Sequence, residues 1–329
     1  MRRRTADCAE ADLAAAAAAV VAGEVIGLPT ETVYGLAADA ANPEAVARIY
    51  RIKGRPTDHP LIVHVLDDAR ARLWAEWTDA AQRLADAFWP GPLSIVLARR
   101  AGAPAWACAG HSTIALRAPS HPVARRLMTA LADAGITGLA APSANRFGRI
   151  SPTSAAHVRA DLGDDVAIVL EGGRAAVGIE STIVDLSRGR PVLLRPGHIA
   201  ADLLARALGQ PVAAADRDAP RVPGALPSHY APVTPLALVA AAELPARIAA
   251  ERSAGRRIAL WSVAPVASAA HDDGVRWYPR PDSVDGMERD LYDGLRQMDA
   301  SASDLIIVER PPASAQWAAI LDRLARAAA

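Results

Sequence analysis

Cationic, hydroxyl-bearing and amide side chains recur at the ends of predicted strands between residues 32 and 195. They are Thr32, Lys53, Arg55, His64, Arg117, Ser143, Asn145, Ser181 and Arg195. Because ligands of α/β sheets bind beyond the strand ends, the loops at these positions can bring such side chains together. Several cations and hydroxyls without a pair of carboxylates suit an anionic ligand, such as a phosphate or a carboxylate, better than acid–base hydrolysis.

Lys53 is the only lysine among 36 Lys and Arg residues. Its ammonium is more compact than a planar guanidinium, so a site that requires a small cation would explain the exception. A composition biased towards arginine that retained one lysine by chance would explain it as well.

Each of the other candidates also has a purely structural explanation. Arg117 and Arg195 can form surface salt bridges, and His64 can be a hydrogen-bonded core histidine. Ser143 and Asn145 are residues typical of turns. For any one of them, the structural explanation is at least as good as the functional one.

Common motifs of nucleotide-binding proteins and hydrolases are missing from the sequence. A P-loop requires Gly-Lys-Ser/Thr, but Lys53 follows Ile52. No two glycines have the G-x-G spacing of a dinucleotide fingerprint, and neither GxSxG nor HExxH occurs. Ordinary hydrolase and dehydrogenase functions therefore have no support.

The composition is that of an ordinary globular protein, with 22% charged and 51% hydrophobic residues in 329. The formal net charge is zero, so no global positive field attracts nucleic acid or an anionic membrane. A site for a polyanion must be a local pocket. Cys8 and Cys108 form neither a C-x-x-C motif nor a disulfide framework, which is typical of a reducing cytosol, and we expect a cytoplasmic protein.

The N-terminal MRRR and the apolar stretch 13–22 imitate a secretory signal. Asp7, Glu10 and Asp12 interrupt that pattern, so we expect an Ala-rich helix that ends at Gly23. No apolar run reaches the length of about 18 residues that a membrane span needs.

The predicted elements mix strands and helices irregularly. Strands at 24–28 and 61–65 flank a helix from Pro43 to about Arg51 and a loop from Lys53 to Pro56. Further strands are predicted at 93–98, 112–117, 139–141, 166–170, 181–185 and 192–194, and helices at 74–88, 121–134, 155–162 and 199–208. This pattern predicts an α/β domain with a mixed sheet.

The composition changes after residue 209. Residues 210–235 hold six prolines and predict an extended, semi-rigid linker. Residues 236–329 have the alternating pattern of a small α/β domain. We therefore expect a first domain at 1–209, a linker at 210–235 and a C-terminal domain at 236–329.

Eight segments in chain order carry a more specific signal. They are PTETVYGL, KGRPTDHPLIVHV, FWPGPLSIVL, ALRAPSHP, APSANRFGRISPT, ESTIVDL, LLRPG and HYAP, and they span about residues 28–232. Together they resemble the YrdC-domain family and, more narrowly, its two-domain threonylcarbamoyl-AMP synthases. The resemblance implies a YrdC-like twisted mixed sheet with flanking helices and a small C-terminal Rossmann-like α/β domain.

The implied activity is synthesis of threonylcarbamoyl-AMP from L-threonine, bicarbonate or CO2, and ATP, with release of pyrophosphate. This nucleotidyltransferase reaction is the first step of tRNA threonylcarbamoyladenosine modification, so the implied partner is the downstream transferase machinery. The reaction brings three anions together, and cations must offset their repulsion. Mg²⁺ is expected with ATP, without a dedicated protein metal site.

The resemblance also implies roles for individual residues. The catalytic set is Lys53, Arg55, Ser143 and Asn145. The threonine-binding set is Thr32, His64, Arg117, Ala141 and Ser181. The ATP-binding set is Arg55, His59, Thr113, Ser143, Ser151, Arg195 and Tyr230.

Two positions depart from the family pattern. His59 stands where the family usually has asparagine, which weakens the inferred ATP contact. The linker segment VPGALPSHYAP lacks basic or aromatic residues between its PG and HYAP parts, so Tyr230 is either a lid over the active site or part of a plain spacer.

Two alternative functions remain open at this point. Carbamoyl transfer of the hydrogenase-maturation type would need a cysteine-rich zinc region, which two cysteines cannot supply. An RNA-binding module would use the concave face of such a fold, but zero net charge and a single lysine argue against strong direct nucleic-acid binding. Membrane association is not expected.

Overall fold

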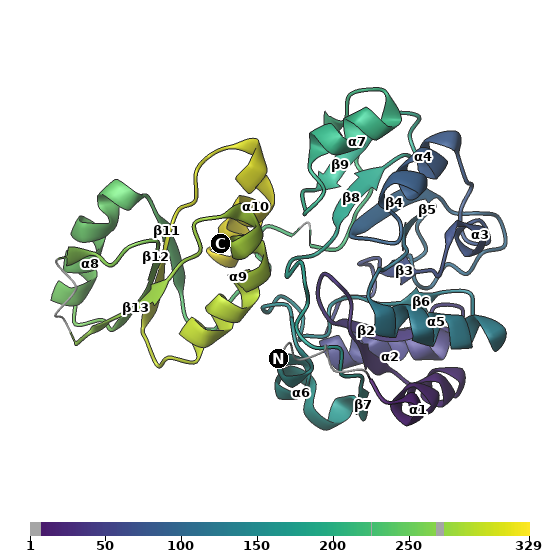
Figure 1. The fold of residues 1–329 in the computed structure, drawn as a ribbon, viewed down its shortest axis with the longest axis horizontal. Coiled ribbons are helices and arrows are strands. Elements are labelled where there is room, and N and C mark those ends of the chain that lie inside the picture. The colour runs from purple at the N-terminus through teal and green to yellow at the C-terminus, as the bar shows by residue number, and fades with distance from the viewer. Residues whose placement is uncertain (1–7, 225, 268–272) are drawn as a thin grey trace, which may run out of the picture. The chain divides into compact units, whose positions relative to one another are not determined.

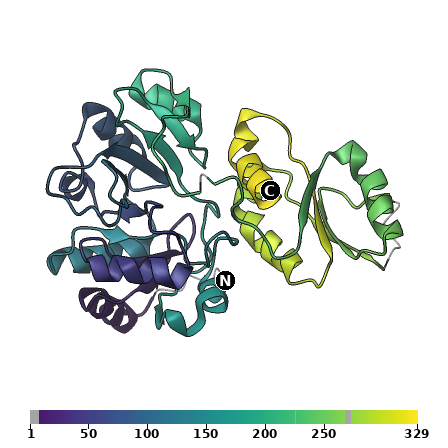
Figure 2. The same ribbon diagram turned by 180° about the vertical axis from the view of Figure 1, so that it is seen from behind.

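The computed structural model describes residues 8–224, 226–267 and 273–329. The chain divides into two compact units, one from 1–147 with 151–225 and the other from 148–150 with 226–329. Each unit has its own sheet and helices (Figures 1 and 2). Within the described ranges, no helix combines the length and apolar character that crossing a membrane requires.

The first unit is built on a ten-stranded mixed sheet with the order β10-β9-β8-β4-β5-β3-β6-β2-β1-β7. Its strands are β1 (Ile26–Leu28), β2 (Gly35–Asp39), β3 (Ile62–His64), β4 (Leu93–Ala98), β5 (Thr113–Arg117), β6 (Leu139–Ala140), β7 (Ile168–Val169), β8 (Thr182–Asp185), β9 (Val192–Arg195) and β10 (Ala213–Ala214). The pairs β1–β7, β3–β5, β4–β8 and β9–β10 are parallel, and the other neighbours are antiparallel. The predicted mixed α/β fold is confirmed.

Helices cover both faces of this sheet. They are α1 (Glu10–Val21), α2 (Pro43–Lys53), α3 (Asp68–Ala71), α4 (Asp79–Phe88), α5 (Pro122–Asp133), α6 (Ala155–Leu162) and α7 (Ala201–Leu208). Apolar residues of α2, α4, α6 and α7 pack in one core cluster with Val63 and Leu116. Residues of α1 and α5 pack in another with Leu139.

The strand register places the predicted site residues on the α1/α5 face. Paired residues on neighbouring strands point to the same face, and His64 pairs with both Leu139 and Arg117. Two residues earlier on β3 and β5, Ile62 and Ala115 belong to a small apolar cluster on this face. The alternation of side chains along two short strands therefore puts His64 and Arg117 next to each other.

Helix α2 has clear sequence signals at both ends. The Asn42 side chain caps its N-terminus by accepting from the backbone N–H groups of Glu44 and Ala45, and Pro43 occupies the first turn. Gly54 ends it in a left-handed conformation with φ of 63°. Lys53 is the last helical residue, so its predicted place in a loop is wrong. The glycine, rather than the lysine, is the residue that leaves the helix.

The predicted linker 210–235 is divided between the two units. Its first part adds β10 to the sheet edge beside β9, a strand that the sequence analysis does not predict. Further along, Val222 packs with Ile62, Val96 and Ala115. Residues 221–223 thus lie on the face that carries His64 and Arg117.

The second unit has a four-stranded parallel sheet with the order β11-β14-β12-β13. The strands are β11 (Leu236–Val239), β12 (Ile258–Ser262), β13 (Val275–Pro279) and β14 (Leu305–Glu309), and the helices are α8 (Leu244–Ser253), α9 (Val284–Asp299) and α10 (Ala318–Ala327). Helix α8 lies on one face of the sheet, and α9 and α10 lie on the other (Figures 1 and 2). This arrangement agrees with the predicted Rossmann-like domain.

Several elements differ from the sequence-based expectations. Strands β2 and β13 and helix α8 are not predicted, and the helix expected from Trp74 begins only at Asp79, where Thr78 caps it. Strand β2, with the sequence GLAAD, has no β-branched or aromatic residue. It forms because β1 and β6 pair with it on both sides, and such tertiary pairing overrides weak local propensity.

We predict that Asn42→Ala lowers the free energy of unfolding by about 1 kcal/mol, because two backbone N–H groups at the start of α2 lose their acceptor. Chemical denaturation measures the change. Asn42→Asp retains a capping oxygen and should stay within about 0.5 kcal/mol of the wild type. Equal losses in the two variants would contradict a capping role.

Candidate active site

The ammonium of Lys53 is buried at the end of α2, where the residue is 3% exposed. Its Nζ donates to the carbonyl oxygens of Ser143 at 2.5 Å and Asn145 at 2.6 Å. The described residues place no carboxylate in ion-pair contact with it. The sequence-predicted catalytic residues Lys53, Ser143 and Asn145 are therefore brought together, although the lysine contacts the backbone of its two partners.

Burial holds the pKa of Lys53 well below its usual range, and the positive charge of Arg55 lowers it further, while Asp161 opposes the shift. A buried cation that contacts only neutral carbonyls is electrostatically uncompensated. An anion bound beside Lys53 would supply the missing negative charge, so this position is suited to an anionic ligand.

The loop at 141–147 is fixed against the start of β2. Ser143 forms a β-bridge with Gly35, and the backbone N–H of Leu36 donates to Pro142. A side chain at Gly35 would lie 3.3 Å from the Cβ of Ala141, which is a tight approach. The Phe147 N–H in turn donates to the carbonyl oxygen of Lys53 at 2.8 Å. The loop and the end of α2 therefore hold each other in place.

Arg55 and His59 both contact the Phe147 ring. The Arg55 guanidinium is 5.6 Å from the ring centroid, and the His59 ring meets Phe147 edge to face at 5.6 Å. Arg55 Nη2 also donates to the Pro60 carbonyl at 2.9 Å. Burial and the charge of Arg55 lower the pKa of His59, so a neutral imidazole stands where the resemblance expects an amide.

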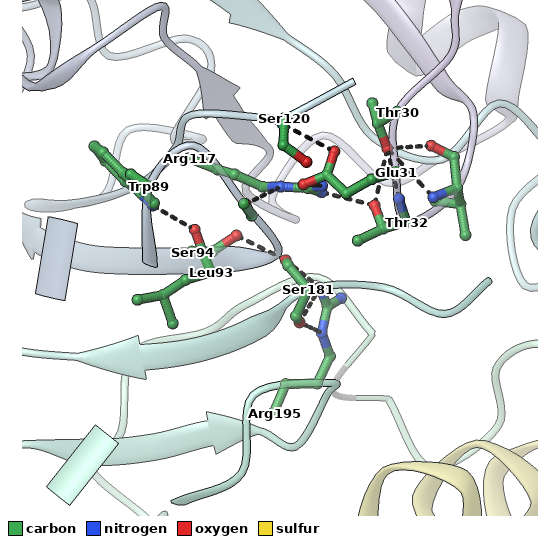
Figure 3. A network of polar contacts seen from close by, with 12 residues as sticks. Thr30, Glu31, Thr32, Trp89, Leu93, Ser94, Arg117, Ser120, Ser181 and Arg195 are labelled. Atoms are coloured by element: carbon green, nitrogen blue, oxygen red, sulfur yellow. Dashed lines mark hydrogen bonds and ion pairs between the residues drawn. The ribbon is translucent and has the colours of Figure 1, made fainter. Parts of the chain in front are cut away.

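Arg117 is 4% exposed and is surrounded by acceptors (Figure 3). Its Nη1 donates to Thr32 Oγ1 at 2.8 Å, its Nη2 lies 2.8 Å from Glu31 Oε1, and its Nε donates to the Gly91 carbonyl at 3.3 Å. The alternative that Arg117 is a surface salt bridge is wrong. The structure brings Thr32 and Arg117 into direct contact, as a shared site requires.

His64 is buried beside Arg117, and its Nδ1 has no hydrogen-bond partner among the described residues. Burial, reinforced by the charge of Arg117, lowers the pKa of His64 to about 3. The imidazole is therefore neutral near pH 7. It is not a satisfied core histidine, because one buried ring nitrogen lacks a partner.

Ser181 and Arg195 form a second buried group. Ser181 Oγ lies 2.8 Å from Ser94 Oγ, and Arg195 Nη2 donates to the Ser181 carbonyl at 2.9 Å and to its Oγ at 3.1 Å (Figure 3). Arg195 Nη1 donates to Pro223 at 3.0 Å, so Arg195 is no surface residue either. The group depends on a close backbone approach, because a Cβ at Gly197 would lie 2.5 Å from the Thr182 nitrogen.

Strand β4 connects this group to Arg117. Gly91, just before β4, accepts from Arg117, and Leu93 at its start pairs with Thr182, the neighbour of Ser181. The Ser94 hydroxyl then reaches Ser181. The two groups therefore flank the beginning of one strand.

Four other predicted residues make fewer contacts with the groups described above. They are Ser151, Thr113, Ala141 and Tyr230. Ser151 is buried and donates to Glu180 Oε1 at 2.5 Å. Thr113 is half-buried at the start of β5 and, by alternation, shares the face of Arg117. Ala141 is buried and donates through its backbone to Ile62 at 3.1 Å. Tyr230 belongs to the second unit, where its ring lies 5.6 Å from that of Tyr292, so its contact with ATP stays a prediction.

Three residues of these groups are missing from the sequence-based candidates, namely Glu31, Ser94 and Glu180. Glu31 directly precedes the candidate residue Thr32 in the loop after β1, so its position beside Thr32 is a sequence signal that could have identified it. Ser94 lies inside a strand with the sequence LSIVLA and has no sequence signal of its own. The structure reveals it because β4 and β8 are neighbours.

Comparison with protein families gives matches over most of the chain. The Sua5/YciO/YrdC family model, described as telomere recombination, matches residues 18–197. A second model, described as the C-terminal domain of threonylcarbamoyl-AMP synthase, matches residues 198–329.

Individual relatives match along nearly their whole length. A threonylcarbamoyl-AMP synthase of Bacillus subtilis is 37% identical over 325 residues, which is 96% of this chain and 92% of the relative. One from Pyrococcus abyssi is 34% identical and covers 93% of this chain and 90% of its own. A solved structure of P. abyssi Sua5 complexed with L-threonine has a TM-score of 0.87 at 32% identity and covers 96% of this chain and 94% of that one. The chain therefore belongs to the Sua5/YciO/YrdC family and carries the C-terminal domain of its threonylcarbamoyl-AMP synthases.

Proposed function

We propose that this chain makes threonylcarbamoyl-AMP from L-threonine, bicarbonate or CO2, and ATP, with release of pyrophosphate. The observation that carries the proposal is the buried ammonium of Lys53, which among the residues described contacts carbonyl oxygens of Ser143 and Asn145 and no carboxylate. Relatives that match nearly the whole chain are named for this activity. The transfer of an adenylyl group would make the enzyme a nucleotidyltransferase.

Threonine would occupy the face that carries Arg117, Thr32 and His64. The guanidinium of Arg117 suits the carboxylate of an amino acid, because both groups are planar and can form two parallel hydrogen bonds. The free Nδ1 of neutral His64 can accept a hydrogen bond from the amine or the hydroxyl of threonine. Ser181 and Ala141 complete the expected threonine-binding set.

The chemical steps need positioning and charge stabilisation. The threonine amine forms a C–N bond with the carbon of CO2 and gives up a proton, or forms it with bicarbonate, from which a C–O bond breaks and water leaves. The resulting carbamate carries a negative charge. A carbamate oxygen then attacks the α-phosphorus of ATP, and the bond to the β-phosphate oxygen breaks to release pyrophosphate. Lys53 would contact the carbamate and the α-phosphate, where a compact ammonium fits between crowded oxygens.

ATP would be held by the cations and hydroxyls next to Lys53. We assign this role to Arg55, His59, Thr113, Ser143, Ser151, Arg195 and Tyr230. Mg²⁺ would accompany the triphosphate. Two buried carboxylates near these residues already have partners, because Glu31 pairs with Arg117 and Glu180 accepts from Ser151. Phosphate and water oxygens would therefore supply most of the ligands to the ion.

The product is a mixed anhydride that hydrolyses unless it is used. We therefore propose that a downstream tRNA threonylcarbamoyl transferase takes it from this enzyme.

The direct test is pyrophosphate release by the purified full-length chain. We expect release only when ATP, L-threonine and bicarbonate are all present, with threonylcarbamoyl-AMP detected by mass spectrometry. Equal release with any amino acid would contradict the threonine assignment. Tight, salt-sensitive tRNA binding without ATP turnover would favour an RNA-binding module instead.

Replacing Lys53 tests the role of its ammonium. We expect Lys53→Ala to lower the rate of pyrophosphate release at least about 100-fold, because charge stabilisation at the α-phosphate is lost. Lys53→Arg should fail as well, since a guanidinium does not fit the space between two carbonyls 2.5 and 2.6 Å from Nζ. The control is Arg206→Ala, which removes an exposed cation paired with Asp202. Normal activity in Lys53→Arg would rule out the requirement for a compact cation.

The neutral state of His64 predicts a pH dependence of stability. Its pKa is lowered to about 3 in the folded protein, so below the unfolded value of about 6.5 the unfolded chain binds a proton that the folded chain does not. This lowers the free energy of unfolding by about 2 kcal/mol between pH 7 and pH 5. Denaturant unfolding of the wild type and His64→Asn at both pH values measures the difference, which should be missing in the variant. Parallel pH profiles for the two proteins would show that His64 is not the group responsible.

A further inference from the structure

Glu31 is a buried carboxylate that contacts Arg117, the residue expected to bind the carboxylate of threonine. Glu31 is 7% exposed and follows β1 in the same loop as Thr32. Its Oε1 lies 2.8 Å from Arg117 Nη2, and its Oε2 accepts from the backbone N–H of Ser120 at 3.1 Å (Figure 3). None of the functional roles assigned above involves it.

The loop that carries Glu31 is rigidly held. Thr30 Oγ1 accepts from the backbone N–H groups of Thr32 and Val33 and donates to the Val33 carbonyl at 2.6 Å. The Glu31 carbonyl accepts from Val177 at 2.7 Å. The backbone and Oε2 of Glu31 thus have hydrogen bonds that do not involve Arg117, so the position of the carboxylate does not depend on its contact with the guanidinium alone.

Arg117 has three separate partners, namely two hydrogen-bond acceptors and the carboxylate of Glu31, with which it forms an ion pair. A guanidinium has five N–H groups in a planar fork. The Gly91 carbonyl, Thr32 Oγ1 and Glu31 Oε1 each face one of its three nitrogens. The N–H groups that remain on the two terminal nitrogens are the donors that a ligand can use, and the plane in which they point is fixed by these partners.

We propose that Glu31 is a positioning residue for substrate recognition, which holds Arg117 so that its remaining N–H groups receive the carboxylate of threonine. This inference rests on the proposed function, since it concerns the same amino-acid site. Of the three partners, only Glu31 carries a charge. It therefore both orients the guanidinium and offsets its charge while the site is empty.

The ionisation of Glu31 is consistent with this role. Burial by itself would raise the pKa of the carboxyl, but the Arg117 guanidinium and the backbone N–H of Ser120 hold the pKa below its usual value. Glu31 is therefore negatively charged near neutral pH. Its loss would leave the buried charge of Arg117 without a counter-charge and free to turn towards other acceptors.

The test compares two ligands that differ in the group that Arg117 recognises. L-threonine has a carboxylate, and L-threoninol has a hydroxymethyl group in its place. Calorimetry on the full-length chain measures both affinities in the wild type, Glu31→Gln, Glu31→Asp and Arg117→Ala. Glu24→Gln is the matched control, because it removes an exposed carboxylate that pairs with Arg48 in the same unit.

We expect Glu31→Gln to weaken L-threonine binding about 10- to 100-fold, the effect of losing well-placed hydrogen bonds to a charged group. Binding of L-threoninol should change less than about 2-fold, because it does not use the oriented guanidinium. In Glu31→Gln, the preference for threonine over threoninol should fall to the value found for Arg117→Ala. Adding Glu31→Gln to Arg117→Ala should not weaken threonine binding any further. Glu24→Gln should retain the wild-type preference.

Two outcomes would overturn the inference. Unchanged or tighter threonine binding in Glu31→Gln would mean that Glu31 merely competes for Arg117. Equal weakening of both ligands would mean that Glu31 only maintains the fold. If Glu31→Gln does not fold, Glu31→Asp decides the question, since its shorter side chain keeps the charge but cannot reach Nη2 at the same distance.

The two proposals can fail separately. A wild type that binds threonine but releases no pyrophosphate would refute the proposed reaction, while the ratio of the two affinities would still support or overturn the role of Glu31. A wild type that binds no threonine would overturn both.

Discussion

The site depends on a buried ammonium for which the described part of the protein provides no ion-pair partner. Lys53 is held by two carbonyl oxygens of the loop at 143–145, and its charge has no carboxylate in contact. Keeping a charge in a position of this kind is unfavourable, so the surrounding structure must hold it there. The Asn42 cap and the Gly54 terminus define the end of α2, and the loop is fastened to β2 through Gly35. These local features together hold a positive charge at a point where a bound anion would compensate it.

Arg117 is a second buried cation, but unlike Lys53 it has a carboxylate partner. It is as deeply buried as Lys53, but Glu31 and Thr32 surround it, so its charge is compensated and its orientation is fixed. The two cations therefore suit different tasks. A compensated, rigid guanidinium can recognise the shape of a carboxylate, whereas an uncompensated ammonium gains most from charge that arrives with the substrates or develops between them. Threonine recognition and carbamate adenylation need these two properties.

The sheet brings these groups together through register rather than through sequence proximity. His64 and Arg117 are neighbours because β3 and β5 are parallel partners, and Ser94 reaches Ser181 because β4 and β8 are also paired. Proline-rich residues then return to the same face, where Val222 packs on the apolar cluster and Pro223 accepts from Arg195. Val222 and Pro223, which belong to the segment predicted as an interdomain linker, therefore lie against residues of the candidate site.

The fold class and the family can be predicted from the amino-acid sequence, and the structure brings several of the candidate residues, such as Lys53 with Ser143 and Asn145, into contact. This prediction is possible because motif residues, helix caps and apolar runs are local signals, as at Asn42, Gly54 and the lone Lys53. Strands β2 and β10 could not be predicted in this way, because their pairing partners outweigh weak local propensity. The pairing of Arg117 with Glu31, and the lack of a carboxylate partner for Lys53 in the described part of the chain, follow from the fold and could not be predicted from the sequence. The state of a buried charge depends on burial and on neighbours distant in sequence, and no local pattern of residues records either.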